Sequence, residues 1–251
     1  KTQEFAKALQ FDPTPLQESK NIYRFVDPTN SLRRLRYDIV TDNFILRYAF
    51  EEDLRLFSER NFTSVDALLS QTRNIMQTYG LYKDDIAGGT TRVTYLRIDG
   101  TSLTQTTSLS KADGVRIDFI RGAIGNFPIV HPNADDAPIS VIYSGSHDAR
   151  KRILQFAYTY WPVDYETVAT YSLRESQQAW QDLQNGSGFI ARYPQKNKVA
   201  VVRNSYLAYY DSFDPQTYLQ PVFVFEGDEG FLAYVPAVSY EWIEQSGATG
   251  L

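Results

Sequence analysis

The sequence predicts an α+β fold of two tandem lobes, in each of which an amphipathic helix packs on an antiparallel β-sheet. Two segments with helical periodicity lie far apart in the chain, and several runs typical of strands follow each of them. Two long helices are too few for right-handed crossovers between parallel strands, which excludes doubly wound nucleotide-binding folds. The length of 251 residues also favours two lobes, because single hydrophobic cores stop growing at roughly 250 to 300 residues.

Three segments are expected along the chain. Residues 1–31 contain several Pro, Asp and Asn residues and few periodic apolar positions, so they predict an extended lead-in with one short helix near Phe5 to Leu9. Residues 32–165 are expected to form the first lobe and residues 166–251 the second.

The first lobe begins with a predicted β-hairpin. Apolar and charged side chains alternate over residues 35–39, a turn follows at 41–43, and residues 44–50 resume an extended run.

A helix is predicted from residue 65 to 79, where apolar residues recur at intervals of three and four. Thr63 or Ser64 can cap its first N–H groups, and Gly80 can end it in the left-handed conformation. Runs rich in β-branched and aromatic residues then predict strands at 92–98, 115–121, 139–144 and 152–161.

The second lobe repeats this order. Ser172 and Glu175 have the spacing of a capping box at a helix start, and Asn185-Gly186 supplies its end. Strands are predicted at 199–210, 218–225 and 231–238. Strict alternation places Tyr206, Ala208 and Tyr210 on one sheet face and Leu207 and Tyr209 on the other.

The net charge and the length of the apolar runs restrict the classes of partner that the sequence predicts. The net charge of −5 comes from 30 acidic and 25 basic residues that are interspersed, so no basic stripe is seen and nucleic acid is not an expected partner. The densest basic cluster, Arg33, Arg34 and Arg36, is interpreted as solvated strand ends. No run reaches the roughly 18 apolar residues that cross a bilayer.

An extracytoplasmic location is expected. The chain begins at Lys1, which suggests an upstream signal peptide or membrane anchor, so contact with a membrane is expected only through that missing N-terminal segment. The absence of cysteine from all 251 positions fits an exported bacterial protein and removes disulfides and thiolate nucleophiles.

The sequence contains no recognised motif for a cofactor, a metal or catalysis, so no cofactor, metal site or catalytic residue is predicted. Gly88-Gly89 precedes a strand rather than a helix, which is the wrong order for a phosphate loop. His131 and His147 lack metal-ligand spacing.

A hydrolase is kept as an alternative, in two forms. His147 could meet Ser144 or Ser146 and an acid, or two carboxylates could flank a glycosidic bond. Paired acids are common, at 51–53, 84–85, 135–136 and 226–229, and the last group could also bind a cation weakly.

Aromatic residues are the main compositional excess, with 18 tyrosines against one methionine. Aromatic rows on sheets are mostly core and cross-strand pairs, and the alternative is an exposed stacking face. The residues predicted to bind a partner are Trp161, Tyr206, Tyr209 and Tyr210.

The segment from residue 172 to 238 carries a resemblance to a known family. Its helix and stop at 179–186, the residues 188–190, and the strands at 202–210 and 218–225 are similar in order and spacing to the C-terminal part of YycI- and YycH-type proteins. Those are membrane-anchored regulators of an essential cell-wall sensor kinase, and the segment more loosely resembles PepSY-like domains. The resemblance implies a tandem α+β extracytoplasmic module with an upstream transmembrane helix and no active site.

Three functions follow as hypotheses. The first is a non-catalytic domain that binds or regulates another cell-envelope protein through a sheet edge or a groove. The second is a cell-surface module that binds glycan or peptide through exposed tyrosines. The third is the hydrolase based on acidic residues.

Overall fold

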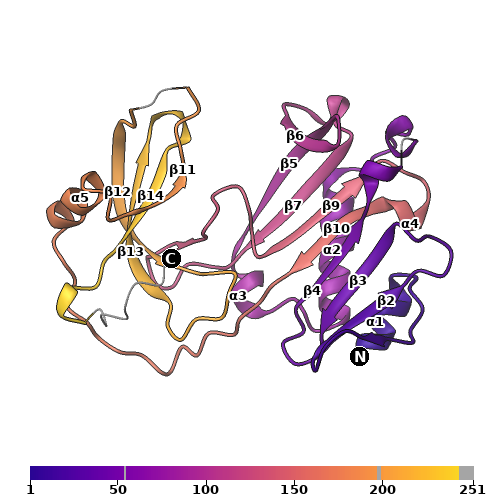
Figure 1. Ribbon diagram of the computed structural model, residues 1–251, viewed down its shortest axis with the longest axis horizontal. Coiled ribbons are helices and arrows are strands. Elements are labelled where there is room, and N and C mark those ends of the chain that lie inside the picture. Colours follow the sequence, from indigo (N-terminus) through magenta and orange to yellow (C-terminus); the bar gives the residue numbers. More distant parts are fainter. Residues whose placement is uncertain (54, 197–198, 243–251) are drawn as a thin grey trace. The chain divides into compact units, whose positions relative to one another are not determined.

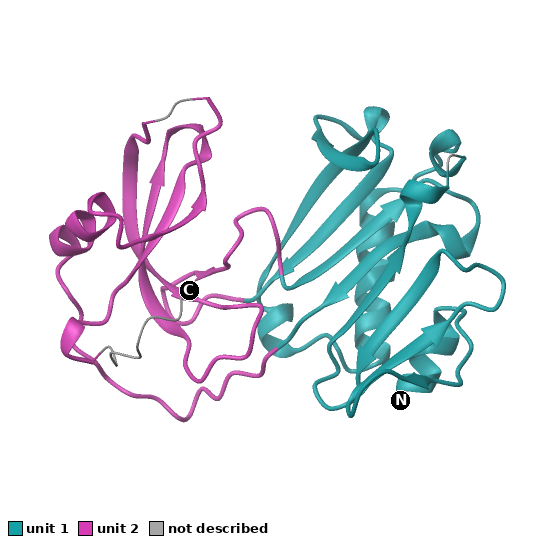
Figure 2. Cartoon of the chain, in the orientation of Figure 1, with its two compact units in different colours: residues 1–121, 138–160 teal, residues 122–137, 161–251 magenta. Residues whose placement is uncertain are grey.

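The computed structural model describes residues 1–53, 55–196 and 199–242, and it has the predicted α+β fold (Figure 1). The chain divides into two compact units (Figure 2). Unit 1 contains residues 1–121 and 138–160, and unit 2 contains residues 122–137 and 161–251. No helix among the described residues is long and apolar enough to cross a membrane.

Unit 1 is built on one antiparallel sheet of nine strands, in the order β1-β2-β3-β4-β10-β9-β7-β5-β6. The strands are β1 (Leu16–Gln17), β2 (Ile22–Val26), β3 (Arg33–Asp38), β4 (Phe44–Tyr48), β5 (Thr90–Asp99), β6 (Ser102–Thr106), β7 (Gly114–Ile120), β9 (Ile139–Ser144) and β10 (Ile153–Tyr158). The helices are α1 (Thr2–Ala8), α2 (Val65–Thr78), α3 (Asp84–Ala87) and α4 (Ala149–Arg152).

The hairpin and the long helix of the first lobe lie where the sequence predicts them. Strands β3 and β4 pair through Leu35 opposite Leu46. The hydroxyl of Ser64 accepts the N–H of Ala67 at 3.2 Å and caps α2, and Gly80 has φ +67° after its last turn.

The predicted lead-in over residues 1–31 is part of unit 1. Strands β1 and β2 extend the sheet beyond β3, and Phe5, Phe11 and Phe25 are buried in the core. The prediction missed the two strands because each is too short to show a clear period, and burial of Phe25 stabilises β2.

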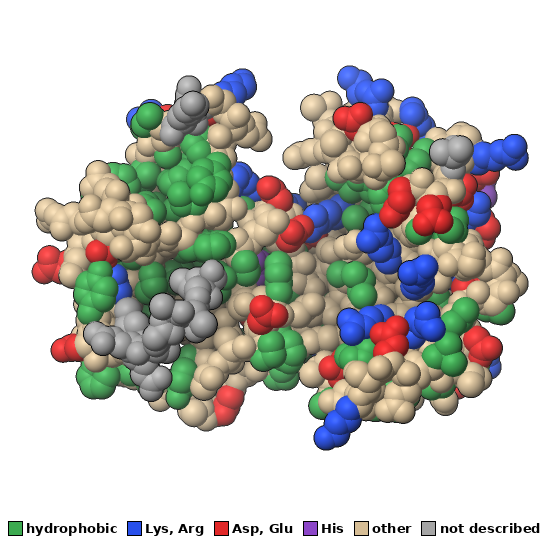
Figure 3. Space-filling model, in the orientation of Figure 1, with side chains coloured by type: hydrophobic (Ala, Val, Ile, Leu, Met, Phe, Trp, Pro, Cys, Tyr) green, Lys and Arg blue, Asp and Glu red, His purple; other side chains and the backbone are tan. Residues whose placement is uncertain are grey.

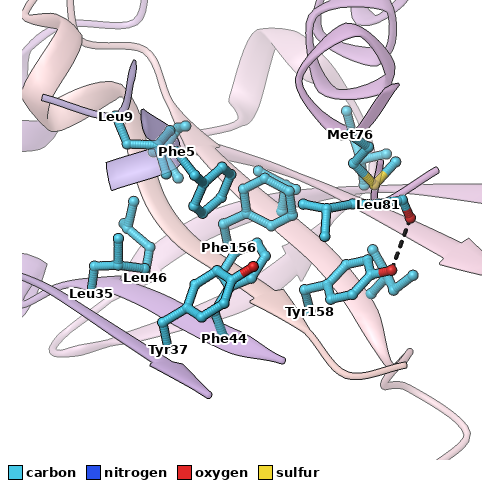
Figure 4. Close-up of a cluster of buried hydrophobic side chains, with 14 of the residues drawn as sticks. Phe5, Leu9, Leu35, Tyr37, Phe44, Leu46, Met76, Leu81, Phe156 and Tyr158 are labelled. Carbon is cyan, nitrogen blue, oxygen red and sulfur yellow. Dashed lines mark hydrogen bonds between the residues drawn. The ribbon is translucent and has the colours of Figure 1, made fainter. Parts of the chain in front are cut away.

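One hydrophobic core lies between the sheet of unit 1 and its helices (Figure 4). Phe44 of β4 stacks on Tyr158 of β10 with ring centroids 5.5 Å apart, and Met76 of α2 is fully buried. The Tyr158 hydroxyl donates to the carbonyl oxygen of Leu81 at 2.9 Å, which ties the segment after α2 to the sheet. The core therefore joins the N-terminal strands to the later ones.

A buried ion pair lies at the start of β3. Arg33 donates from Nη1 to Asp27 at 2.6 Å and from Nη2 to the carbonyl of Leu9 at 2.8 Å. The interpretation of Arg33 as a solvated strand end is therefore wrong, whereas its neighbour Arg34 is exposed. Alternation along the strand explains the difference, because consecutive side chains point to opposite faces.

Among its described residues, unit 2 contains a five-stranded sheet in the order β11-β14-β13-β12-β8 and one α-helix, α5 (Ser176–Gln184). The strands are β8 (Ile129–Val130), β11 (Phe189–Arg192), β12 (Val202–Tyr210), β13 (Gln220–Gly227) and β14 (Leu232–Pro236). Helix α5 packs on one face of the sheet, where Trp180 meets Phe225 at 5.7 Å between ring centroids.

Two features of unit 2 differ from the predicted second lobe. Strand β8 belongs to residues 122–137, which were assigned to the first lobe, and it pairs with β12 in parallel. The second segment of unit 2 begins at Trp161, whereas the second lobe was predicted to begin at residue 166. The remaining pairs in this sheet are antiparallel, as expected.

The predicted capping box at Ser172 and Glu175 is not formed. Helix α5 begins at Ser176, and its N-cap Glu175 makes no side-chain capping bond. Leu173 forms a β-bridge with Val238, and the N–H of Arg174 donates to the carbonyl of Ala237 at 2.9 Å. Pairing with residues 237 and 238 thus keeps residues 173 and 174 out of the helix.

The adjacent arginines of β3 allow a matched test of the buried ion pair. Arg33→Met should lower the free energy of unfolding by about 3 kcal/mol, because it removes the closer cationic partner of the buried Asp27 carboxylate and leaves Arg150 at 3.5 Å. Arg34→Met should change it by less than about 0.5 kcal/mol, because Arg34 is exposed. Urea unfolding of both variants measures the difference, and equal effects would contradict the assignment.

Candidate functional site

Strand β12 has an open edge over most of its length. It pairs with β13 from Val202 to Tyr210, but on its other side only Tyr209 and Tyr210 pair with β8. In the part of the chain that the structure describes, no strand pairs with this side of residues 202–208 (Figure 1). Unpaired strand edges present N–H and C=O groups that can bind another chain.

The contact with β8 shows which backbone groups face that edge. The N–H of Tyr209 donates to Pro128 and that of Asp211 donates to Val130, both at 2.9 Å. Backbone groups of an antiparallel strand alternate between its two neighbours, so the N–H and C=O groups of Leu207 and Ser205 point the same way as those of Tyr209. These two residues present the hydrogen-bonding groups of the open edge.

Tyr206 and Tyr210 lie together on the sheet face opposite α5, around the buried Ala208. The Tyr206 hydroxyl donates to Glu226 Oε1 at 2.6 Å, and Tyr210 contacts Tyr234 edge to face at 6.1 Å. Burial, with help from the adjacent Glu226 carboxylate, raises the pKa of Tyr206 above its ordinary value. Tyr206 is therefore a neutral donor at physiological pH.

Leu207 and Tyr209 lie on the other face, as the alternation predicts. Leu207 packs with the cluster under α5, and Tyr209 contacts Phe127 edge to face at 6.1 Å. Trp161 is elsewhere in unit 2, where its Nε1–H donates to the carbonyl of Phe213 at 3.0 Å.

The four predicted binding residues thus do not form one surface. Each is partly buried and makes contacts within the chain. Tyr206, Tyr209 and Tyr210 lie on the strand that carries the open edge, whereas the backbone of Ser205 and Leu207 was not among the groups predicted from the sequence. No local signal could have identified them, because the open edge depends on how far β8 extends along β12.

The serine and histidine residues of the hydrolase alternative lie at the end of β9. The Ser144 hydroxyl donates to the carbonyl of Lys151 at 2.7 Å, and the Ser146 hydroxyl donates to Glu59 at 3.4 Å. Glu59 also accepts the backbone N–H of His147 at 2.9 Å. Both hydroxyl protons are therefore directed to acceptors other than the His147 ring.

Each predicted acidic pair supplies a carboxylate to an ion pair with an arginine or lysine of the chain. These pairs are Glu51 with Arg47, Asp53 with Lys151, Asp85 with Arg121, Asp135 with Arg192, and Asp228 with Arg203. Within residues 1–53, 55–196 and 199–242, no group of three or more acidic or histidine side chains could hold a metal ion.

A polar pocket of about 410 Å³ lies in unit 1 beside the Asp27–Arg33 pair. It is lined by Thr29, Asn30, Leu32, Tyr48, Glu52, Asp53, Asp148, Arg150 and Lys151. Asp53 accepts from Lys151 at 2.7 Å and from the Tyr48 hydroxyl. Burial opposes ionisation of Asp53, but these hydrogen bonds outweigh it and lower its pKa.

Comparison with known proteins gives one distant likeness. No protein-family model matches the chain, and no curated protein sequence matches it. The solved structure of the Bacillus megaterium YpeB C-terminal domain is similar over 95% of this chain and 92% of that one, with 9% sequence identity and a TM-score of 0.41. A similarity of this size carries no argument about function.

The lowered pKa of Asp53 gives a pH-dependent prediction. Its carboxylate stabilises the fold above the ordinary pKa of 3.8, and this stabilisation is lost as the pH falls through the lower folded-state value. Asp53→Asn should therefore lower the free energy of unfolding by about 1 to 3 kcal/mol at neutral pH. The difference from the unsubstituted protein should shrink below about pH 4 in urea unfolding. A difference that stays constant down to strongly acidic pH would contradict the assignment.

Proposed function

We propose that this chain is a non-catalytic, extracytoplasmic domain of an exported or membrane-anchored bacterial protein, and that it binds or regulates another envelope protein. The partner would add a strand to the open edge of β12. The observation that carries this proposal is the edge itself, where Ser205 and Leu207 present their backbone groups.

Strand addition would combine affinity with some sequence selectivity. Backbone hydrogen bonds to Ser205 and Leu207 would hold the added strand, and its side chains would alternate between the two sheet faces. One set would lie beside Tyr206 and the other beside Leu207. An apolar partner strand would suit both neighbours.

The usable part of the edge is limited at both ends. A bulge lies between Val202 and Asn204, and Arg203 pairs with Asp228 at 2.7 Å, features that protect strand edges from unwanted pairing. Strand β8 covers Tyr209 and Tyr210 at the other end. The site would therefore accept a short segment rather than a long strand.

The other candidate functions have weaker support. A glycan-binding face requires exposed aromatic rings, whereas Trp161, Tyr206, Tyr209 and Tyr210 are partly buried. A serine hydrolase requires a hydroxyl that donates to histidine, whereas those of Ser144 and Ser146 donate elsewhere. Kinship with YycI- and YycH-type or PepSY-like proteins remains a prediction from residues 172–238.

Substitution of Ser205 tests strand addition. Short peptides selected on the unsubstituted protein from a displayed random library should bind Ser205→Ala within about twofold, because the backbone N–H is kept. Binding to Ser205→Pro should weaken about tenfold or more, because proline removes the N–H that faces the edge. The Ser205 side chain is exposed and this N–H does not pair with β13, so the fold should persist.

Fluorescence anisotropy measures these affinities, and thermal unfolding checks that each variant is folded. Failure to select any peptide would contradict the proposal. So would peptides that bind the folded Ser205→Pro variant as tightly as Ser205→Ala, because they would then bind another surface.

The proposed location has a separate test. The complete reading frame, expressed in bacteria with a C-terminal tag, should be digested by protease added outside spheroplasts while a cytoplasmic marker is protected. Protection of the tag until the cells are lysed would contradict an extracytoplasmic location and leave the β12 proposal to be judged by peptide binding.

A further inference from the structure

The solvent face of β2, β3 and β4 in unit 1 carries four arginines in two facing pairs. The strand register places Arg24 opposite Arg36 and Arg34 opposite Arg47, and all four are exposed. The residues between them, such as Leu35 and Leu46, point into the core. We call this surface the arginine face. In Figure 3, basic side chains gather with acidic and apolar ones over these strands.

Positive charge is in excess on the arginine face. Glu18 accepts from Arg36 at 2.9 Å and lies 3.7 Å from Arg24, and Glu51 pairs with Arg47 at 2.7 Å. No carboxylate among the described residues is recorded within ion-pair distance of Arg34. Two carboxylates thus serve four guanidinium groups, in a chain whose net charge is −5.

Asp38, at the end of β3, reduces this excess by one charge but does not remove it, because three carboxylates still face four guanidinium groups. One of its oxygens accepts the N–H groups of Val40 and Thr41 at 2.8 and 3.2 Å, so it serves the turn. Like charges directly opposite each other on neighbouring strands are destabilising, and this surface holds two such pairs. A bound anion would relieve that repulsion.

Exposed apolar side chains lie between the arginines. Leu16 of β1 is opposite Arg24, Val26 is opposite Arg34, and Ile45 is opposite Arg36. These three side chains are 47%, 41% and 40% exposed. The arginine face is therefore a mixed surface of positive and apolar groups, and arginine is enriched at protein interfaces relative to the rest of the surface.

A second arginine group in the same sheet is arranged around a buried acid. Arg92 and Arg116 both donate to Asp118, at 2.8 and 2.7 Å, and the Asp118 carboxylate is fully buried. There the arginines serve the fold. The exposed arginines of β2, β3 and β4 have no buried acid of this kind.

We propose that the arginine face is a docking surface for an acidic polypeptide segment that presents both apolar side chains and glutamate or aspartate on the side that meets it. Guanidinium groups bind carboxylates through two parallel hydrogen bonds, and all four basic residues here are arginine rather than lysine. Apolar side chains of the segment would cover Leu16, Val26 and Ile45, which a polymer of phosphate groups would leave exposed to water. This surface is in unit 1 and does not depend on the edge of β12.

The test uses a short labelled peptide that repeats Glu-Glu-Leu-Leu, so that an extended chain presents both glutamate and leucine on each side, with fluorescence anisotropy at physiological salt. Arg34→Gln combined with Arg36→Gln should weaken its binding about tenfold or more, because two charge-assisted contacts are lost. The matched control is Lys7→Gln with Arg97→Gln, which removes the same charge at two exposed positions outside the arginine face. It should change the affinity by less than about threefold.

Two further probes separate the chemistry of the ligand. A peptide that repeats Glu-Glu-Ser-Ser should bind more weakly than the glutamate–leucine peptide, because it covers no apolar surface. Inorganic polyphosphate of similar charge should also bind more weakly. Thermal unfolding should show that the Arg34 and Arg36 variant is at least as stable as the unsubstituted protein, because a like-charge repulsion is removed.

Three outcomes would overturn the proposal. Absence of peptide binding would do so, and equal weakening by the control variant would show attraction to overall charge alone. Tighter binding of polyphosphate than of the glutamate–leucine peptide would assign the surface to phosphate ligands instead.

Discussion

The fold of unit 1 depends on the pairing of β10 with β4 on one side and with β9 on the other. This strand joins the N-terminal strands to the strands that follow α2, and without it the sheet would separate into two parts. Its inward side chains Phe156 and Tyr158 are almost completely buried in the shared core. The register of β10 with β4 and β9 fixes which side chains of these strands share a face. It therefore aligns the core-facing side chains of the two parts of the sheet.

In unit 2 the corresponding constraint is the unequal pairing of β12. Its contact with β13 runs the whole length of the strand, whereas β8 covers only its last two residues. Backbone groups left without a strand partner must be satisfied by water or by another chain. The short β8 therefore leaves most of this edge open, which is the basis of the proposed strand addition, and the bulge after Val202 restricts the length of the open part.

Charge is used in three ways by this chain. Arg33 and Asp27 form a buried pair that anchors the start of β3. Asp118 accepts from two arginines within the sheet, and the arginines of β2, β3 and β4 remain exposed with fewer acids than arginines. The same residue type thus supports the core in one place and lies exposed on the proposed docking surface in another, according to the face on which alternation places it.

Features set by local order were predicted well from the residues alone. The α+β class, the capped helix from Val65, the hairpin of β3 and β4, and the two faces of residues 206–210 were all expected. Where pairing with a distant segment conflicted with a local sequence pattern, the structure follows the distant pairing. The capping box at Ser172 gave way to a bridge between Leu173 and Val238, and residues 122–137 joined unit 2 through β8.

The sequence by itself determined the fold class, the main helices and which side chains alternate, because the periods of helices and strands are local properties of the chain. Tertiary structure decided that residues 1–31 complete a sheet, that Arg33 is buried, and that Arg24 and Arg47 join Arg34 and Arg36 on one surface. It also decided which edge of β12 stays open. These outcomes depend on pairing between residues far apart in the chain, and no local pattern specifies which partners meet.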